Sequence, residues 1–147
     1  MANAIVEADP NVSVLILSGS PVIGSYEFRS GIDFVRIPGV VKLIDGDYDS
    51  ANLRVGVEHT LEMRTRIIRD TADIYRPHLF IVDKEPTGLR GEVLPALRLL
   101  KERGTPLVLG LRDVMDDPRG ACRGVGSARH VVPTLRDLYD EIWIYGL

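Results

Sequence analysis

The sequence predicts an α/β fold with a mainly parallel sheet, and three observations support this. Short aliphatic runs recur at 12–17, 79–82 and 107–111, as expected of strands buried on both faces of a parallel sheet. Each run ends in polar residues and a loop. Stretches with helical spacing separate the later runs, as crossovers between parallel strands require. The resulting order, β-β-α-β-α-β-(α)-β, is typical of a doubly wound sheet.

The length and composition indicate one domain over residues 1–147, with 45% apolar and 27% charged residues. The net charge of −3 gives no reason to expect a nucleic-acid partner. No apolar run is long enough to span a bilayer. Cys122 is the only cysteine and the three histidines are scattered, so we expect no metal site. The first residues lack a signal-peptide pattern, and we expect a cytoplasmic protein.

The amino-terminal part predicts one helix and two strands. Residues 2–8 have the spacing of a helix end, which stops at the Asp-Pro-Asn sequence that follows. The stretch 12–17 is almost entirely aliphatic and predicts a buried strand. The pattern at 22–31 predicts neither a helix nor a strand clearly. Residues 32–37 alternate between apolar and polar and predict a shorter strand near an edge of the sheet.

The next segment, 40–50, is predicted to be a solvated loop with Asp45-Gly46-Asp47 at its tip. The spacing of Asp45, Asp47 and Asp49 resembles the start of a calcium-binding loop. The glutamate that would close such a loop is missing, so we favour the solvated loop over a calcium site.

Two helices are predicted in the middle of the chain. The first covers 56–76 and has an apolar stripe on one face, made by Val57, Leu61, Ile68, Ala72 and Tyr75. Its other face carries Arg64, Arg66, Arg69 and Asp70, which we interpret as a solvated face. The second helix covers 92–103, with Pro95 in its first turn and Gly104 as its C-terminal cap.

The last part of the chain predicts a strand at 107–111 and a final strand at 141–145. Between them, residues 119–132 are rich in arginine and glycine and show no helical stripe. We predict an irregular loop there, of a length that is unusual inside a compact domain.

Charged residues follow the central strand directly, where Asp83, Lys84 and Glu85 come after the run at 79–82. Ligands bind at the carboxyl ends of the strands in open α/β sheets. We therefore predict Asp83 or Glu85 as the catalytic, hydroxyl-binding carboxylate, with Lys84 and Arg90 facing an anionic group. The alternative is that Lys84, Glu85 and Arg90 form a network that only fixes the loop.

Two other strand ends offer candidates for substrate binding. Ser18, Gly19 and Ser20 form a small-residue turn that would let a ligand approach the backbone, although an ordinary turn is the favoured alternative. Arg112 and Asp113 end the strand at 107–111. They are candidates for substrate binding or for an internal ion pair.

Five stretches carry a resemblance to a known family: SGSP, RIPGVVKL, DGDY, FIVDKEPTGLRGEVLP and LGLRDVMDDP. They resemble the amino-terminal domain of a group of bacterial predicted glycosyltransferases in the GT-B superfamily. That group is similar to the N-acetylglucosaminyltransferase that makes the lipid-linked peptidoglycan precursor. The resemblance covers residues 2–118 and 133–146. Its more specific parts are DKEPxGLRGE and LRDVxD.

This resemblance implies a Rossmann-like, acceptor-side domain of an enzyme that, when intact, transfers a sugar from a nucleotide sugar to a hydroxyl. It implies no cofactor, and it implies a small-molecule acceptor and a nucleotide sugar as partners. Charge and composition add the expectation of no nucleic acid and no integral membrane segment. The family's first strand and its donor domain have no counterpart here, so we expect an incomplete fragment that is inactive alone. Strands 12–17 and 79–82 would then pair with each other or leave a gap, and we expect self-association through the incomplete sheet.

Two further hypotheses remain open. One is a stand-alone α/β module that binds a nucleotide or an anionic metabolite, although the chain has neither a GxGxxG turn after a strand nor a GxxxxGK[ST] loop. The other is a non-functional relic of a broken gene. The glycosyltransferase hypothesis is the one that we expect the chain to fit.

Overall fold

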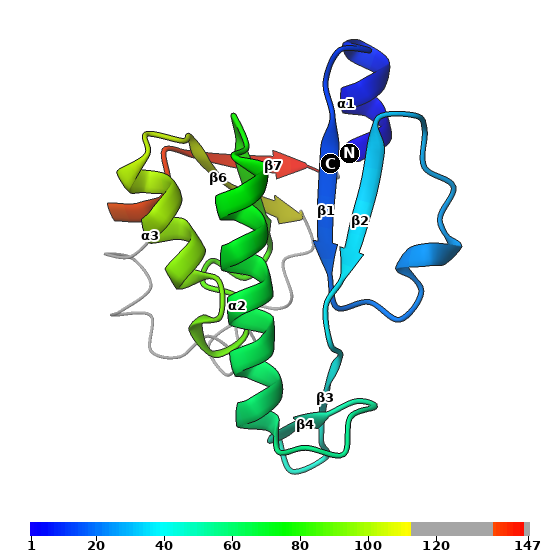
Figure 1. Cartoon of the computed structure of the whole chain (residues 1–147), viewed down its shortest axis with the longest axis vertical. Helices are drawn as coiled ribbons and strands as arrows, with labels where there is room; N and C mark the ends of the chain where they lie inside the picture. The colour runs from blue at the N-terminus through cyan, green and yellow to red at the C-terminus, as the bar shows by residue number, and fades with distance from the viewer. Residues whose placement is uncertain (113–136, 146–147) are drawn as a thin grey trace. The chain divides into compact units, whose positions relative to one another are not determined.

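The computed structural model describes residues 1–112 and 137–145, and these residues have an α/β structure (Figure 1). In chain order the helices and strands are α1 (Ala2–Ala8), β1 (Val14–Ser18), η1 (Ile23–Ser25), β2 (Ile32–Arg36), β3 (Val40–Lys42), β4 (Tyr48–Ser50), α2 (Val57–Tyr75), β5 (Phe80–Asp83), η2 (Leu89–Gly91), α3 (Leu94–Glu102), β6 (Leu107–Arg112) and β7 (Glu141–Tyr145). The chain divides into two compact units, Met1–Ile67 and Ile68–Leu147. The irregular loop predicted at 119–132 lies outside the described residues.

The first unit contains a parallel pair of strands, β1 and β2, which lie side by side in Figure 1. Their register runs from Val14 opposite Ile32 to Ser18 opposite Arg36. The amide of Ile37 donates to Ser18 O at 2.9 Å and continues the pairing beyond β2. Both predicted strands are therefore confirmed. Helix α1 lies against β2, and its bounds agree with the helix predicted at 2–8.

The prediction of a loop over 40–50 is wrong, because this segment forms an antiparallel hairpin of β3 and β4. Gly46 supplies the positive φ of +94° that the tight turn needs. The Oδ1 atom of Asp45 accepts the amide of Asp47 at 3.0 Å, and that of Asp49 accepts the amide of Ser50 at 2.7 Å. These carboxylates therefore stabilise the hairpin's backbone, which is a role typical of Asp in turns.

Helix α2 confirms the helix predicted at 56–76, but its buried face differs from the predicted one. Thr60, Leu61, Arg64, Ile68 and Ala72 are buried, and their spacing places them on one side of the helix. Arg64 is only 9% exposed, so its assignment to the solvated face is wrong. Its position in the stripe, three residues after Leu61 and four before Ile68, explains its burial.

The second unit contains the parallel sheet β5-β6-β7, which confirms the α/β class with a parallel sheet. The described strands form three separate sheets, and not the single sheet that was predicted. Central strand β6 and helix α3, which packs against it, supply the most buried side chains of this unit's core in equal part. The most buried apolar side chains here are Ala96, Leu97, Leu100, Leu107, Val108 and Leu109. Pro95 lies in the first turn of α3, as predicted. Gly104, with φ of +75°, follows its end. Strand β1 belongs to the two-stranded sheet β1-β2, and β5 belongs to the sheet β5-β6-β7.

Candidate functional site

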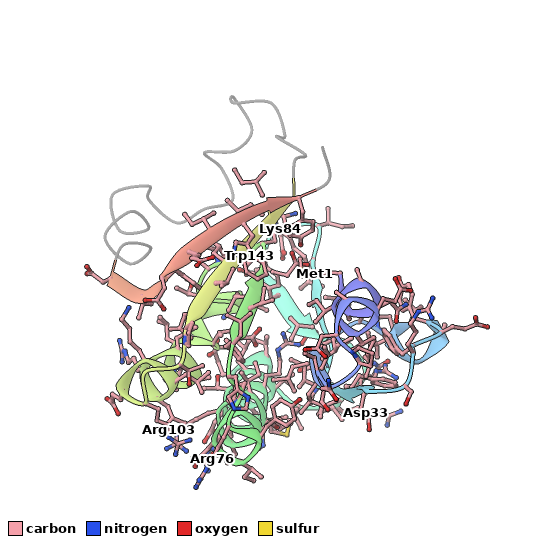
Figure 2. The ribbon with its side chains drawn as sticks, turned by 90° about the horizontal axis from the view of Figure 1, so that it is seen from above. Met1, Asp33, Arg76, Lys84, Arg103 and Trp143 are labelled. Carbon is pink, nitrogen blue, oxygen red and sulfur yellow. The ribbon has the colours of Figure 1, made fainter. Side chains whose placement is uncertain are left out.

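The carboxyl ends of β5, β6 and β7 form one edge of the second unit's sheet. These strands are parallel, with Asp83 opposite Gly110 and Arg112 opposite Tyr145. Figure 2 shows Lys84, which follows β5, on the side of this unit away from Arg103. Three predicted site residues, Asp83, Lys84 and Glu85, thus lie at the predicted edge. Arg112 ends β6 at the same edge, and Asp113 lies outside the described residues.

At this edge, the hydroxyl of Tyr145 donates a hydrogen bond to Asp83 Oδ1. The bond runs from β7 to β5 and passes over the central strand at Gly110. A Cβ atom at position 110 would lie 3.1 Å from Tyr145 Cε1, closer than ordinary contact. Glycine at this position therefore makes room for the tyrosine ring.

A tight turn at Lys84 presents Asp83. The amide of Glu85 donates to Asp83 O at 2.8 Å, which is the hydrogen bond of a γ-turn. The amide of Lys84 donates to Gly110 O, also at 2.8 Å. Both peptide groups that flank Lys84 are therefore held by hydrogen bonds, and the position of Asp83 at the strand end is fixed.

The rest of the loop is shaped by its backbone and by Tyr139. The amide of Gly88 donates to Glu85 O at 2.9 Å and closes a turn with Pro86 in second place, which is a favoured position for proline. The hydroxyl of Tyr139 donates to Pro86 O. Tyr139 is 7% exposed, and this burial raises its pKa well above the ordinary value.

The charged side chains of this loop project into solvent. Asp83, Lys84, Glu85 and Arg90 are all exposed. Within residues 1–112 and 137–145, the side chains of Lys84 and Glu85 make no hydrogen bond or ion pair. Arg90 does have an interaction partner. Because backbone hydrogen bonds already shape the loop, a Lys84–Glu85–Arg90 network is not needed to explain it.

Two of these cations occupy backbone conformations that glycine would adopt without strain. The φ angles are +68° at Lys84 and +49° at Arg90, and such a conformation costs an ordinary residue about 1–2 kcal/mol. Arg76 also has a positive φ, +50°. It follows the last residue of α2, where this conformation is common and a cation stabilises the helix dipole. The γ-turn sets the positive φ at Lys84, and Arg90 has an interaction partner, so only the choice of a lysine side chain at position 84 is left without a local reason.

The turn after β1, in the first unit, uses its hydroxyls internally. Ser18 Oγ accepts the amide of Ser20 at 3.1 Å, and Ser20 Oγ accepts the amide of Val22 at 3.3 Å. This is the behaviour expected of serine in an ordinary turn. The hydroxyls therefore have a structural task that does not require a ligand.

Arg64, also in the first unit, is a residue whose structural role sequence reasoning missed. Its Nη1 donates to Pro38 O at 2.7 Å, in the turn after β2. The same Nη1 lies 2.7 Å from the place where a Cβ atom on Gly19 would stand. Arg64 thus contacts the turns that follow both β1 and β2. The signal that could have revealed it is its place in the apolar stripe of α2.

The other parts of the described structure offer weaker candidates for a functional site. One hollow of about 280 Å³ lies beside the C-terminal half of α3 and Leu138, lined by Arg98, Lys101 and Glu102. Lys101 Nζ already donates to Leu138 O there, at 3.0 Å. Over residues 1–112 and 137–145, no three His, Cys, Asp or Glu residues gather as metal ligands.

Comparisons with protein-family models, with curated proteins and with solved structures found no match to this chain. Among the described helices, none is both long and apolar enough to cross a membrane. A functional assignment must therefore be argued from the strand-end edge and from the resemblance of the sequence motifs.

Proposed function

We propose that this chain is the Rossmann-like, acceptor-side domain of a GT-B glycosyltransferase, which transfers a sugar from a nucleotide sugar to a hydroxyl. The observation that supports this most is the loop after β5. It presents a carboxylate, Asp83, and two cations, Lys84 and Arg90, at the carboxyl edge of a parallel sheet. This is the edge where α/β sheets bind their ligands. The DKEPxGLRGE motif of the resemblance covers the same loop.

Sugar transfer needs both a carboxylate and cationic groups, each in a different role. The acceptor oxygen attacks the anomeric carbon, the bond from that carbon to the nucleoside diphosphate breaks, and the diphosphate leaves with the electron pair. A carboxylate accepts the proton of the acceptor hydroxyl. We assign this role to Asp83, with Glu85 as the second candidate. Lys84 and Arg90 are suited to stabilise a phosphate group.

The backbone at Lys84 and Arg90 adds support. Glycine would relieve the strain at both positions, since both have positive φ angles. At Lys84, whose side chain makes no hydrogen bond or ion pair with the described residues, a lysine kept despite that strain supports contact with a ligand. We keep Arg112 as a substrate-binding candidate, because β6 ends at the same edge, and we assign the Ser18-Gly19-Ser20 turn a structural role.

The second candidate function is a stand-alone module that binds a nucleotide or an anionic metabolite. The exposed Lys84 supports it, since an anion would also be attracted to this loop. The two functions differ in the ligand that this chain binds at the loop by itself. An acceptor-side domain should bind a neutral glycoside, whereas the anion-binding module should bind nucleotides and ignore glycosides.

Hydrogen–deuterium exchange, read by mass spectrometry on the 147-residue chain, tests this directly. The probes are methyl and octyl glycosides of common hexoses and N-acetylhexosamines, then nucleoside diphosphates, each at millimolar concentration. We expect a glycoside to slow exchange in residues 83–92 by about twofold or more, because an occupied loop opens less often.

The variant Lys84→Gly should weaken this protection, because it removes an ammonium group that can donate a hydrogen bond to a sugar hydroxyl. It should keep or gain stability, because glycine fits its backbone. Arg76→Gly is the matched control, since it relieves a similar positive φ away from the loop. Protection by nucleoside diphosphates alone would overturn the acceptor-side assignment in favour of the anion-binding module. Absence of protection by every probe would overturn both.

A further inference from the structure

We infer that Tyr145 is a positioning residue for Asp83, a role that neither the sequence motifs nor the resemblance assigns to it. The inference rests on the proposed function, because it takes Asp83 as the group that meets the ligand hydroxyl. Tyr145 lies 62 residues after Asp83 in the sequence, yet its hydroxyl donates to Asp83 Oδ1. The sheet alone brings these two residues together.

The register of the sheet shows why the contact is specific. Asp83 pairs with Gly110, and Gly110 pairs with Trp143. Residues in register share a face, and so do residues two apart on one strand. Asp83, Gly110 and Tyr145 therefore belong to one face of the sheet. Because Gly110 lies between them and has no side chain, the ring of Tyr145 can reach the aspartate.

A side chain at position 110 would disturb this arrangement. The added Cβ atom would stand 3.1 Å from Tyr145 Cε1 and 3.6 Å from its hydroxyl oxygen. Gly110 is itself buried in the central strand, where glycine weakens a sheet and often marks a close approach by another group. The approaching group in this case is the ring of Tyr145.

The hydrogen bond has a consequence for how Asp83 can act. Its backbone is fixed by the turn at Lys84, but an exposed aspartate would otherwise sample several χ1 rotamers. A hydrogen bond from Tyr145 to a charged oxygen favours one rotamer by on the order of tenfold. Within the described residues, Oδ2 accepts no hydrogen bond from the protein. Tyr145 thus holds one oxygen and leaves the other for a ligand hydroxyl.

The alternative is that Tyr145 only links β7 to β5 and does not affect how Asp83 meets a ligand. Tyr145→Phe separates the two roles, since it keeps the ring over Gly110 and removes the hydroxyl alone. Tyr26→Phe is the matched control, because Tyr26 is 61% exposed and lies in the first unit. Gly110→Ala is a second route to the same effect, since it displaces the ring and keeps the hydroxyl.

The first measurement needs no ligand. The three-bond couplings of the Asp83 β-protons, measured by NMR, report its χ1 rotamers in the wild-type protein and in each variant. We expect one rotamer in the wild type and in Tyr26→Phe, and rotamer averaging in Tyr145→Phe and Gly110→Ala. A single unchanged rotamer in Tyr145→Phe would overturn the positioning role and leave the proposed function standing.

The second measurement is the affinity for the glycoside that protects residues 83–92 from exchange. We expect Tyr145→Phe to weaken it about five- to tenfold through loss of one charged hydrogen bond, with Tyr26→Phe unchanged. An unchanged affinity in Tyr145→Phe would also overturn the positioning role. If no glycoside binds the wild type, the proposed function fails, and the rotamer measurement alone decides whether Tyr145 positions Asp83.

Discussion

Gly88 is the residue at which the loop after β5 should be least tolerant of a side chain. Its backbone angles are φ +67° and ψ −170°, a region that is essentially restricted to glycine. A Cβ atom there would lie 2.5 Å from Val93 Cγ2 and 2.9 Å from Glu92 Cγ. Val93 and Glu92 are both buried, so neither side chain can move aside freely.

The substitution Gly88→Ala therefore combines two costs. The backbone conformation costs a residue other than glycine about 1–3 kcal/mol. Forcing a methyl group into a packed site costs about 1–3 kcal/mol more. We expect the free energy of unfolding to fall by roughly 2–6 kcal/mol in total.

Gly104→Ala is the control that separates the two costs. Gly104 also has a positive φ, +75°, but a Cβ atom there would meet nothing within 4 Å. This variant should lose only the backbone part, about 1–2 kcal/mol. The difference between the two variants then measures the steric contact with Val93 and Glu92 together with the extra backbone cost of the Gly88 conformation.

Urea unfolding followed by the fluorescence of Trp143 is the assay. Trp143 is the only tryptophan in the chain, and it lies in the second unit together with both glycines. We expect Gly88→Ala to be less stable than Gly104→Ala by at least about 1 kcal/mol. Equal stability of the two variants would refute the argument that Val93 and Glu92 enforce glycine at position 88.

Two further predictions concern residues that hold turns in place. Arg64→Met should lower the free energy of unfolding by about 1–3 kcal/mol, because it leaves Pro38 O without its donor. Arg66→Met, which breaks only an exposed pair, should cost less than about 0.5 kcal/mol in the same urea titration. Burial holds the pKa of Tyr139 above its ordinary value, so above about pH 10 the unfolded chain releases this proton before the folded chain does. Stability should therefore fall with rising pH more steeply in the wild type than in Tyr139→Phe. Identical slopes of stability against pH in the two proteins, between about pH 8 and about pH 11, would contradict this.

Sequence reasoning succeeded where a local pattern decides the structure. The final strand at 141–145 and the helix at 2–8 have the bounds that were predicted, because each has a clear hydrophobic pattern with clear stops. The hairpin of β3 and β4 was missed. Val41 and Lys42 in its first strand are both exposed, so no buried face produced an alternating pattern. Its Asp-Gly turn was the signal that remained.

The candidate site was predictable only in part, for a related reason. Asp83, Lys84 and Glu85 could be found because a polar group directly after an aliphatic run is a local signal. Tyr145 and Gly110 gave no such signal. Their contact depends on the register of three strands, and no single stretch of sequence contains it.

In the loop after β5, the residues that set the backbone conformation differ from those that carry the exposed charge. The contribution of each to ligand binding can therefore be tested separately. Its shape depends on Gly88 and on the hydrogen bond from Tyr139 to Pro86 O. Its exposed charges include Lys84, whose side chain takes no part in that shape. Lys84→Gly changes the charge and leaves the shape, whereas Gly88→Ala changes the shape and leaves the charge. If both variants lose glycoside protection, the ligand needs the geometry of the loop. If only Lys84→Gly loses it, the ammonium group of Lys84 holds the glycoside whatever the geometry of the loop, and the case for a shaped acceptor site is refuted.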